Sequence, residues 1–179
     1  MSDLFDRVLK DQDIFKKLLG KIPGFDGYIE RANRRVSDKL LREKIAGQYE
    51  ELWQRLSALQ VDFINQGEIK YVDDLESAAI KLRQFIDRIR TAAYGYTPFF
   101  NAVKINVADL ERVYKYDLAL FDLADEVSRG IDNIEASIGT EGLPAAIRNV
   151  VSLAKKCISA FEKRSDVMMA PADAGTEAQ

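Results

Sequence analysis

Apolar residues recur at alternating steps of four and three along the chain, and this spacing is the strongest constraint on its fold. The first such series lies in a proline-free stretch from about residue 28 to 66 and comprises Ile45, Tyr49, Leu52, Leu56, Leu59 and Phe63. A single helix over this stretch would be about 58 Å long at 1.5 Å per residue. Its apolar seam must lie against another helix to escape water.

A second series with the same spacing fills the segment from about 68 to 94: Val72, Leu75, Ala79, Leu82, Ile86, Ile89 and Ala93. Gly67 lies between the two series, where a glycine commonly ends a helix. Two long seams separated by so short a break predict an antiparallel helical hairpin.

Two further helices are expected near 107–138 and 141–164, with Gly139 between them and Pro144 in a first helical turn. An amphipathic helix precedes them all at the N-terminus. We therefore predict an all-α fold, an elongated antiparallel helical bundle or coiled coil of four main helices plus this N-terminal helix. Residues 1–165 would form one domain, and residues 166–179, which lack a period, a disordered tail. The predicted core includes Leu52, Leu56, Leu59, Leu75, Leu82, Ile86, Phe121 and Ile134.

The chain has no histidine and a single cysteine, Cys157. Without histidine, Ser-His and Cys-His nucleophile pairs and the common zinc and di-iron motifs are excluded. One cysteine forms no internal disulfide, so Cys157 is interpreted as a small apolar residue. The sequence thus predicts no catalytic, cofactor-binding or metal-ligating residue, and we expect a protein that is not an enzyme.

The formal net charge is only −3, with both signs interspersed, so nucleic acid is not expected as a partner. No apolar stretch approaches the roughly 20 residues that a membrane span needs, and any membrane contact would be peripheral. The first residues carry acids where a signal peptide carries bases, which predicts a cytoplasmic protein.

Two groups of apolar residues are candidate interaction surfaces. One is the aromatic loop near Pro98, which either docks a partner or, as we favour, seals the end of the bundle: Tyr94, Tyr96, Phe99 and Phe100. The other is the apolar side of the N-terminal helix, a face for a membrane or for a partner: Leu4, Phe5, Val8, Phe15, Leu18 and Leu19.

Charged clusters are interpreted as solvated helix faces. The acidic ones could in principle hold Mg²⁺, but no metal-loop spacing supports this: Glu50-Glu51, Asp73-Asp74, and Asp122, Asp125 and Glu126. A basic strip comprises Arg31, Arg34, Arg35, Lys39 and Arg42, which we expect to form solvated salt bridges with Glu30, Asp38 and Glu43.

An amphipathic first helix that opens with Leu4-Phe5-Asp6-Arg7-Val8, followed by a long helical hairpin, resembles the layout of the phage-shock and ESCRT-like membrane-remodelling proteins. The resemblance implies a first helix in the membrane interface and hairpins that polymerise. The chain departs from that pattern in the acids of its first helix, Asp3, Asp6, Asp11 and Asp13, which anionic lipid would repel.

These observations favour a non-enzymatic helical interaction or scaffold protein that associates with itself. The alternatives are a peripheral membrane protein that uses the N-terminal helix, and a small-ligand carrier or enzyme that uses carboxylates and the aromatic loop. The longest helix exceeds its neighbours, so its early part needs a cover: Ala32, Val36, Leu40 and Leu41. Either the N-terminal helix or a second chain could supply it, and we favour a symmetric homodimer.

Overall fold

The computed structural model describes residues 12–22, 34–92 and 107–169, and these residues form helices and the turns between them. The helices are α2 (Gln12–Lys21), α4 (Arg34–Asn65), the short 3₁₀ helix η1 (Ile69–Tyr71), α5 (Val72–Thr91), α7 (Val107–Ser137) and α8 (Leu143–Met169). No strand occurs in these ranges. The predicted all-α bundle is confirmed.

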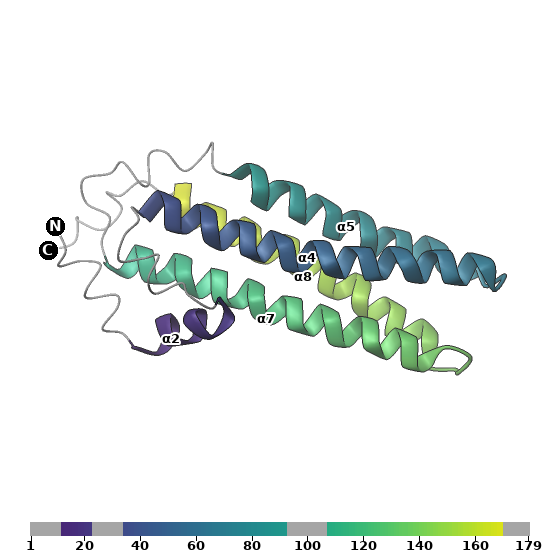
Figure 1. Ribbon diagram of the computed structural model, residues 1–179. Coiled ribbons are helices and arrows are strands. Elements are labelled where there is room, and N and C mark those ends of the chain that lie inside the picture. Colours follow the sequence, from purple (N-terminus) through teal and green to yellow (C-terminus); the bar gives the residue numbers. More distant parts are fainter. Residues whose placement is uncertain (1–11, 23–33, 93–106, 170–179) are drawn as a thin grey trace, which may run out of the picture.

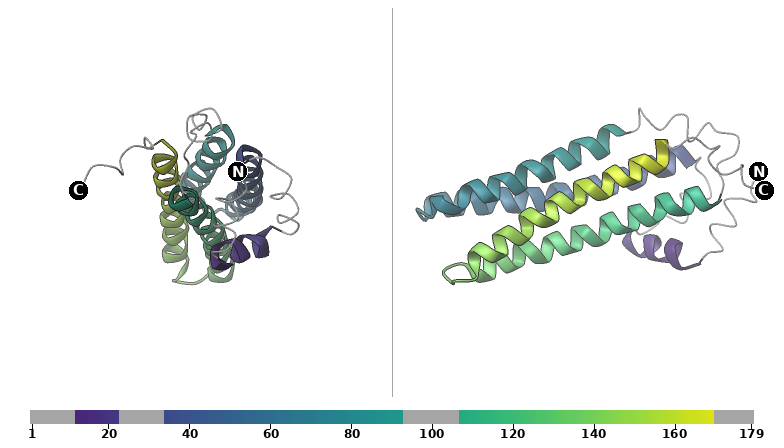
Figure 2. Two further views of the ribbon diagram at one scale, coloured as in Figure 1. Left: turned by 90° about the vertical axis from the view of Figure 1, so that its left-hand side faces the viewer. Right: turned by 180° about the vertical axis from the view of Figure 1, so that it is seen from behind.

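The bundle consists of two antiparallel hairpins, α4–α5 and α7–α8, that lie side by side with their turns at the same end (Figure 1). From behind, α8 runs between α5 and α7 (Figure 2), and it contacts both of them. The short helix α2 lies outside this bundle, against α7. The result is an elongated rod with four main helices and one accessory helix.

Both hairpin turns depend on a glycine with a positive φ angle, +78° at Gly67 and +77° at Gly139. After α4, the N–H of Gly67 donates to the carbonyl of Ile64 and the N–H of Glu68 donates to that of Phe63. This pair of bonds satisfies carbonyls that the helix end would leave open, and glycine adopts the required conformation without strain.

The core follows the heptad seams of all four main helices. Every residue of the predicted core is buried, which confirms that prediction: Leu52, Leu56, Leu59, Leu75, Leu82, Ile86, Phe121 and Ile134. Helix α7 packs tightly on α8 at Gly130, where an added Cβ would lie 2.9 Å from Cγ2 of Val150. A larger residue there would push the helices apart.

The C-terminal helix is longer than predicted. We expected it to end at Arg164 and a tail to begin at residue 166, but α8 continues to Met169, with Val167 and Met168 buried. The prediction was wrong because a charged residue at position 164 looks like the end of the apolar pattern, whereas Arg164 occupies a buried seam position between Phe161 and Met168. Residues 170–179 lie outside the described residues, as do residues 28–33 of the predicted long helix.

Leu56 tests the placement of the α4 seam. The Leu56→Ala substitution should lower the free energy of unfolding by about 2–5 kcal/mol, since it removes buried methyl groups and leaves a cavity. Urea denaturation measures the change, and Ile138→Ala at an exposed position is the matched control. An unchanged midpoint for Leu56→Ala would show that the seam is misplaced.

Candidate functional site

Four charged side chains are buried in the core at the end of the bundle that lies opposite the hairpin turns: Asp38, Arg42, Asp117 and Arg164. At most 5% of the surface of each residue is exposed. Two are cations and two are anions, so the group is electrically balanced. We refer to these four residues as the ionic layer.

The ionic layer joins all four main helices through hydrogen bonds. Arg164 of α8 donates from Nε to Oδ1 of Asp117 at 2.6 Å and from Nη2 to Oδ1 of Asp38 at 2.6 Å. The second oxygen of Asp38 accepts a bond from Nε of Arg42 at 2.8 Å. Arg42 also donates to the backbone carbonyl of Ile89 in α5 at 3.0 Å.

Each member of the layer occupies a position that the heptad spacing assigns to the core. Asp38 and Arg42 continue the α4 series backwards from Ile45 by steps of three and four, and Asp117 lies between Val113 and Leu120 in α7. Burial of a charge is costly unless it is paired and hydrogen-bonded, so the four must meet to be tolerated. The layer therefore penalises any other register of the helices.

Burial raises the pKa of Asp117 above its ordinary value, and the neighbouring Arg164 opposes that rise. Both carboxylates of the layer accept hydrogen bonds from arginine, so their oxygens are already engaged. This arrangement suits a structural ion cluster better than a general base, whose lone pair must face a substrate. The sequence interpretation of Asp38 and Arg42 as a solvated pair was wrong, because both point into the core.

A second polar contact crosses the core near its middle. The hydroxyl of Tyr49 donates to the carbonyl of Leu120 at 2.8 Å and lies 3.3 Å from Sγ of Cys157. Burial raises the pKa of the Cys157 thiol to about 11 and holds the pKa of Tyr49 well above its usual value. At neutral pH the thiol is therefore protonated and a poor nucleophile.

Helix α2 is attached to α7 by apolar and ionic contacts. Leu18 and Ile22 are buried and Leu19 is partly buried, while Nζ of Lys21 lies 3.5 Å from Asp122 and hydrogen-bonds to Asp125. The hydrogen bond to Asp125 raises the pKa of Lys21. Of the proposed membrane or partner face, Leu18 is thus buried where α2 packs on the bundle in this structure. The side chains of Leu4, Phe5, Val8 and Phe15 are not among those described.

The other predicted surfaces have different outcomes. The aromatic loop of Tyr94, Tyr96, Phe99 and Phe100 lies outside the described residues. Several members of the acidic clusters form ion pairs with bases on other helices. Glu50 pairs with Arg83 and Arg90, and Asp122 and Asp125 pair with Lys21. Within the described ranges, no group of three or more acidic, cysteine or histidine side chains could hold a metal ion.

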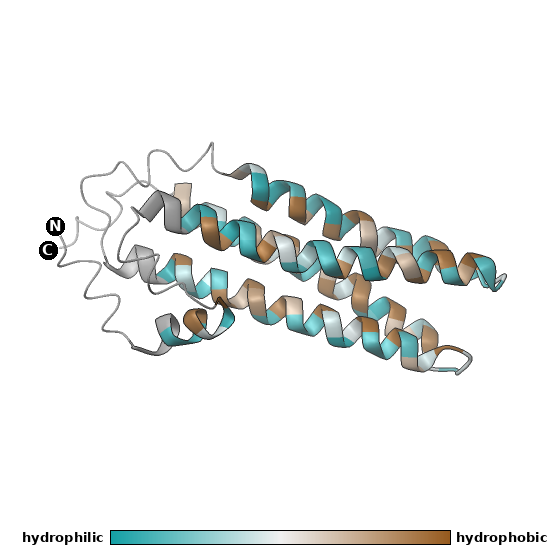
Figure 3. Ribbon diagram, viewed as in Figure 1, coloured by the Kyte–Doolittle hydropathy of each residue, from teal (hydrophilic) through white to brown (hydrophobic). Residues whose placement is uncertain are grey.

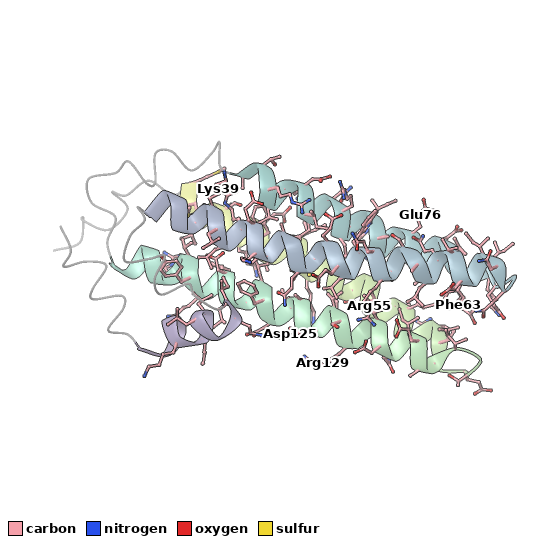
Figure 4. All side chains as sticks on the ribbon, viewed as in Figure 1. Lys39, Arg55, Phe63, Glu76, Asp125 and Arg129 are labelled. Carbon is pink, nitrogen blue, oxygen red and sulfur yellow. The ribbon has the colours of Figure 1, made fainter. Side chains whose placement is uncertain are left out.

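Ion pairs also link the two hairpins at the surface. Arg55 of α4 (Figure 4) reaches across to α7, where it contacts Asp132 at 2.7 Å and Glu135 at 3.1 Å. Arg88 of α5 pairs with Glu162 of α8 at 3.0 Å. Such exposed pairs contribute at most about 1 kcal/mol each, so the apolar seams and the ionic layer dominate the pairing of the hairpins.

An apolar surface lies on the outer side of the α4–α5 hairpin, toward its turn. Four large apolar residues are exposed there: Val61 at 56%, Ile64 at 53%, Ile69 at 68% and Ile80 at 48%. Figure 3 shows hydrophobic and hydrophilic residues interleaved along this end of α4 and α5. We call this surface the tip face and define it as Trp53, Val61, Ile64, Ile69, Glu76 and Ile80.

The sequence did not single out the tip face, because its residues lie outside the core series. A signal was present: Trp53, Ser57, Gln60 and Ile64 form a second series with steps of four, three and four, on the face of α4 next to the core series. Only Trp53 and Ile64 of this second series are apolar, so its pattern is much weaker than that of the core series.

A shallow polar depression of about 360 Å³ lies between α7 and α8, above Gly130. Its walls carry two bases, one acid and two amides, together with Leu153: Arg129, Lys156, Glu126, Asn133 and Asn149. It is open to solvent, and this mixture of charges favours no particular ligand.

Comparison with protein-family models, curated proteins and solved structures finds no match to this chain. The resemblance in layout to the membrane-remodelling hairpin proteins therefore stays a prediction. None of the helices described here has the length and apolar character needed to cross a membrane.

Loss of a buried arginine from the ionic layer should lower the free energy of unfolding far more than loss of an exposed arginine. Arg164→Met should lower the free energy of unfolding by about 3–5 kcal/mol, because it leaves Asp38 and Asp117 buried without their shared cation. The matched control is Arg88→Met, which removes an exposed pair with Glu162 and should cost no more than about 1 kcal/mol. Equal losses in urea denaturation would refute the structural role of the layer.

Cys157 should resist modification until the bundle opens. Its side chain is fully buried, so a reagent cannot reach it, and its pKa is about 11, so the thiol is protonated at pH 8. Iodoacetamide should label the native protein only at the rate at which it unfolds, and it should label the urea-unfolded chain rapidly. Rapid labelling of the native protein, followed by mass spectrometry, would contradict the burial.

Proposed function

We propose that this chain is a non-enzymatic helical interaction protein, a rigid bundle that presents the tip face to a protein partner. The observation that carries the proposal is the grouping of exposed apolar residues. Of the six large hydrophobic residues exposed in the described part of the chain, four belong to the tip face: Val61, Ile64, Ile69 and Ile80. Grouped apolar exposure of this kind is typical of interaction sites.

The charged groups of the core give no support to an enzymatic alternative. Asp38 and Asp117 accept hydrogen bonds from arginine, and Tyr49 and Cys157 contact each other in the core. These groups hold helices together and have no solvent access. The interaction proposal draws further support from their rigidity, because a fixed hairpin loses little entropy when it binds.

A second copy is the partner that the sequence favours, because the early part of α4 needs a cover. In the structure Leu41 is already fully buried, and Leu40 is partly buried against the core that contains Leu18. Part of the predicted gap is therefore covered within the chain. Ala32 lies outside the described residues, and so does the side chain of Val36. The proposal includes self-association, with a second copy of this chain as the partner.

Site-specific photocrosslinking tests the proposal. A photoreactive amino acid is placed at Ile69 in the tip face or, as the control, at Ile138 in the turn end of α7–α8, and the protein is irradiated in cells that naturally produce it. We expect adducts of higher mass from position 69 and none from position 138. An adduct of twice the chain mass would identify a second copy as the partner. No adduct at position 69, or the same adducts at both positions, would contradict the proposed role.

A further inference from the structure

We infer that the tip face binds a basic amphipathic helix of another protein. The inference rests on the proposed function and adds the chemistry of the partner. It is carried by the shape of the apolar surface, by the charges around it and by the position of the one tryptophan in the chain.

The apolar residues of the tip face lie along one side of the hairpin. The guanidinium of Arg83 in α5 lies over the ring of Trp53 in α4, 5.3 Å from its centre, so these two residues share a side. Residues three or four positions apart lie on one helix face. Ile64 follows Trp53 by eleven residues, and Ile80 and Glu76 precede Arg83 by three and seven, which places all three on that side.

The surface between α4 and α5 is long enough for a helix. Figure 1 shows the two helices side by side up to their turn, and the ring contact of Phe63 with Tyr71 fixes their alignment near it. Trp53 and Ile80 therefore lie toward the middle of the hairpin, and Ile64 and Ile69 lie at its end. A partner helix with apolar residues at i, i+3, i+4 and i+7 matches such a strip.

The charges around the strip are acidic. Asp73 and Glu76 precede Ile80 by seven and four residues and therefore share its side of α5, and Glu68 adjoins Ile69 in the turn, whereas Asp62 and Asp74 lie on the far sides of their helices. Glu76 lies within the tip face and points away from the bundle (Figure 4). Lys70 faces Glu68 at 3.4 Å, and Arg83 at the border of the strip faces Glu50 at 3.1 Å. Lys70 and Arg83 are thus already paired with acids of this chain, and Lys81, which follows Ile80, hydrogen-bonds to Ser77.

An excess of acid around an apolar strip selects for lysine or arginine beside the apolar residues of the partner. Two copies that met symmetrically through this face would place acids against acids, which disfavours self-pairing here. Anionic lipid would be repelled for the same reason. A basic helix of a different protein satisfies both the apolar and the charged requirement.

Trp53 gives a direct measurement of binding, because it is the only tryptophan and lies in the tip face. The probes are two synthetic tryptophan-free peptides with the same leucine stripe, one with lysine and one with glutamate at every polar position. The lysine peptide should change the Trp53 emission saturably and more weakly at high salt. The glutamate peptide should leave it unchanged.

Variants separate specific docking from general attraction to an acidic protein. The double substitution Ile64→Ser with Ile69→Ser, and separately Glu76→Lys, should each weaken binding of the lysine peptide by roughly tenfold or more. The control on the other hairpin turn, Ile138→Ser with Glu141→Lys, should bind as the unchanged protein does. All of these positions are exposed, so we expect each variant to fold, and circular dichroism is the measurement that checks this.

Three results would overturn the inference: equal binding of both peptides, unchanged affinity after Ile64→Ser with Ile69→Ser, or an equal loss in the control. If neither peptide binds while the crosslinker at position 69 still gives adducts, the partner chemistry is wrong and the proposed function stands. If the adducts are also missing, the proposed function fails as well.

Discussion

Arg164 hydrogen-bonds to both Asp38 and Asp117, and the arrangement of the bundle depends on this contact. The three residues come from α8, α4 and α7, and Arg42 extends the same network to carbonyls of α5. Apolar seams alone tolerate several registers, because one leucine can replace another at a similar depth. Buried charges do not, since a shift of one turn would leave a carboxylate or a guanidinium without its partner. The layer thereby stabilises one pairing of the two hairpins.

The two ends of the rod have different chemistry, and the proposed function follows from that difference. At the end with the ionic layer, charges are inside the core and α2 is fastened to α7 by Leu18 and Lys21. At the end with the turns, apolar side chains such as Ile64 and Ile69 face solvent among acids. A bundle that is held in register at one end can present a fixed surface at the other, which is what a helical interaction protein requires.

The sequence predicts much of the fold because heptad spacing is local. It located the hairpin turns at Gly67 and Gly139 and the buried residues of the seams. It did not reveal the ionic layer, because a charge at a seam position looks like the end of a seam until its partner on another helix is known. Arg164 is the plainest case: in the sequence it looks like the end of the apolar pattern, whereas in the structure it is buried against Asp117 and α8 continues to Met169. The tip face was missed for a related reason, since Trp53 and Ile80 come together only when α4 and α5 are paired.

A double-mutant cycle between Asp117 and Arg164 tests the central role of the ionic layer most directly. The free energy of unfolding is measured for the unchanged protein, Asp117→Leu, Arg164→Met and the double variant. We expect the double variant to be more stable than the sum of the single losses would allow, by about 2 kcal/mol or more, because each single variant leaves the other charge buried without this partner and the double variant removes both charges. Losses that add to within about 0.5 kcal/mol would show that the two residues act independently, and would contradict the account.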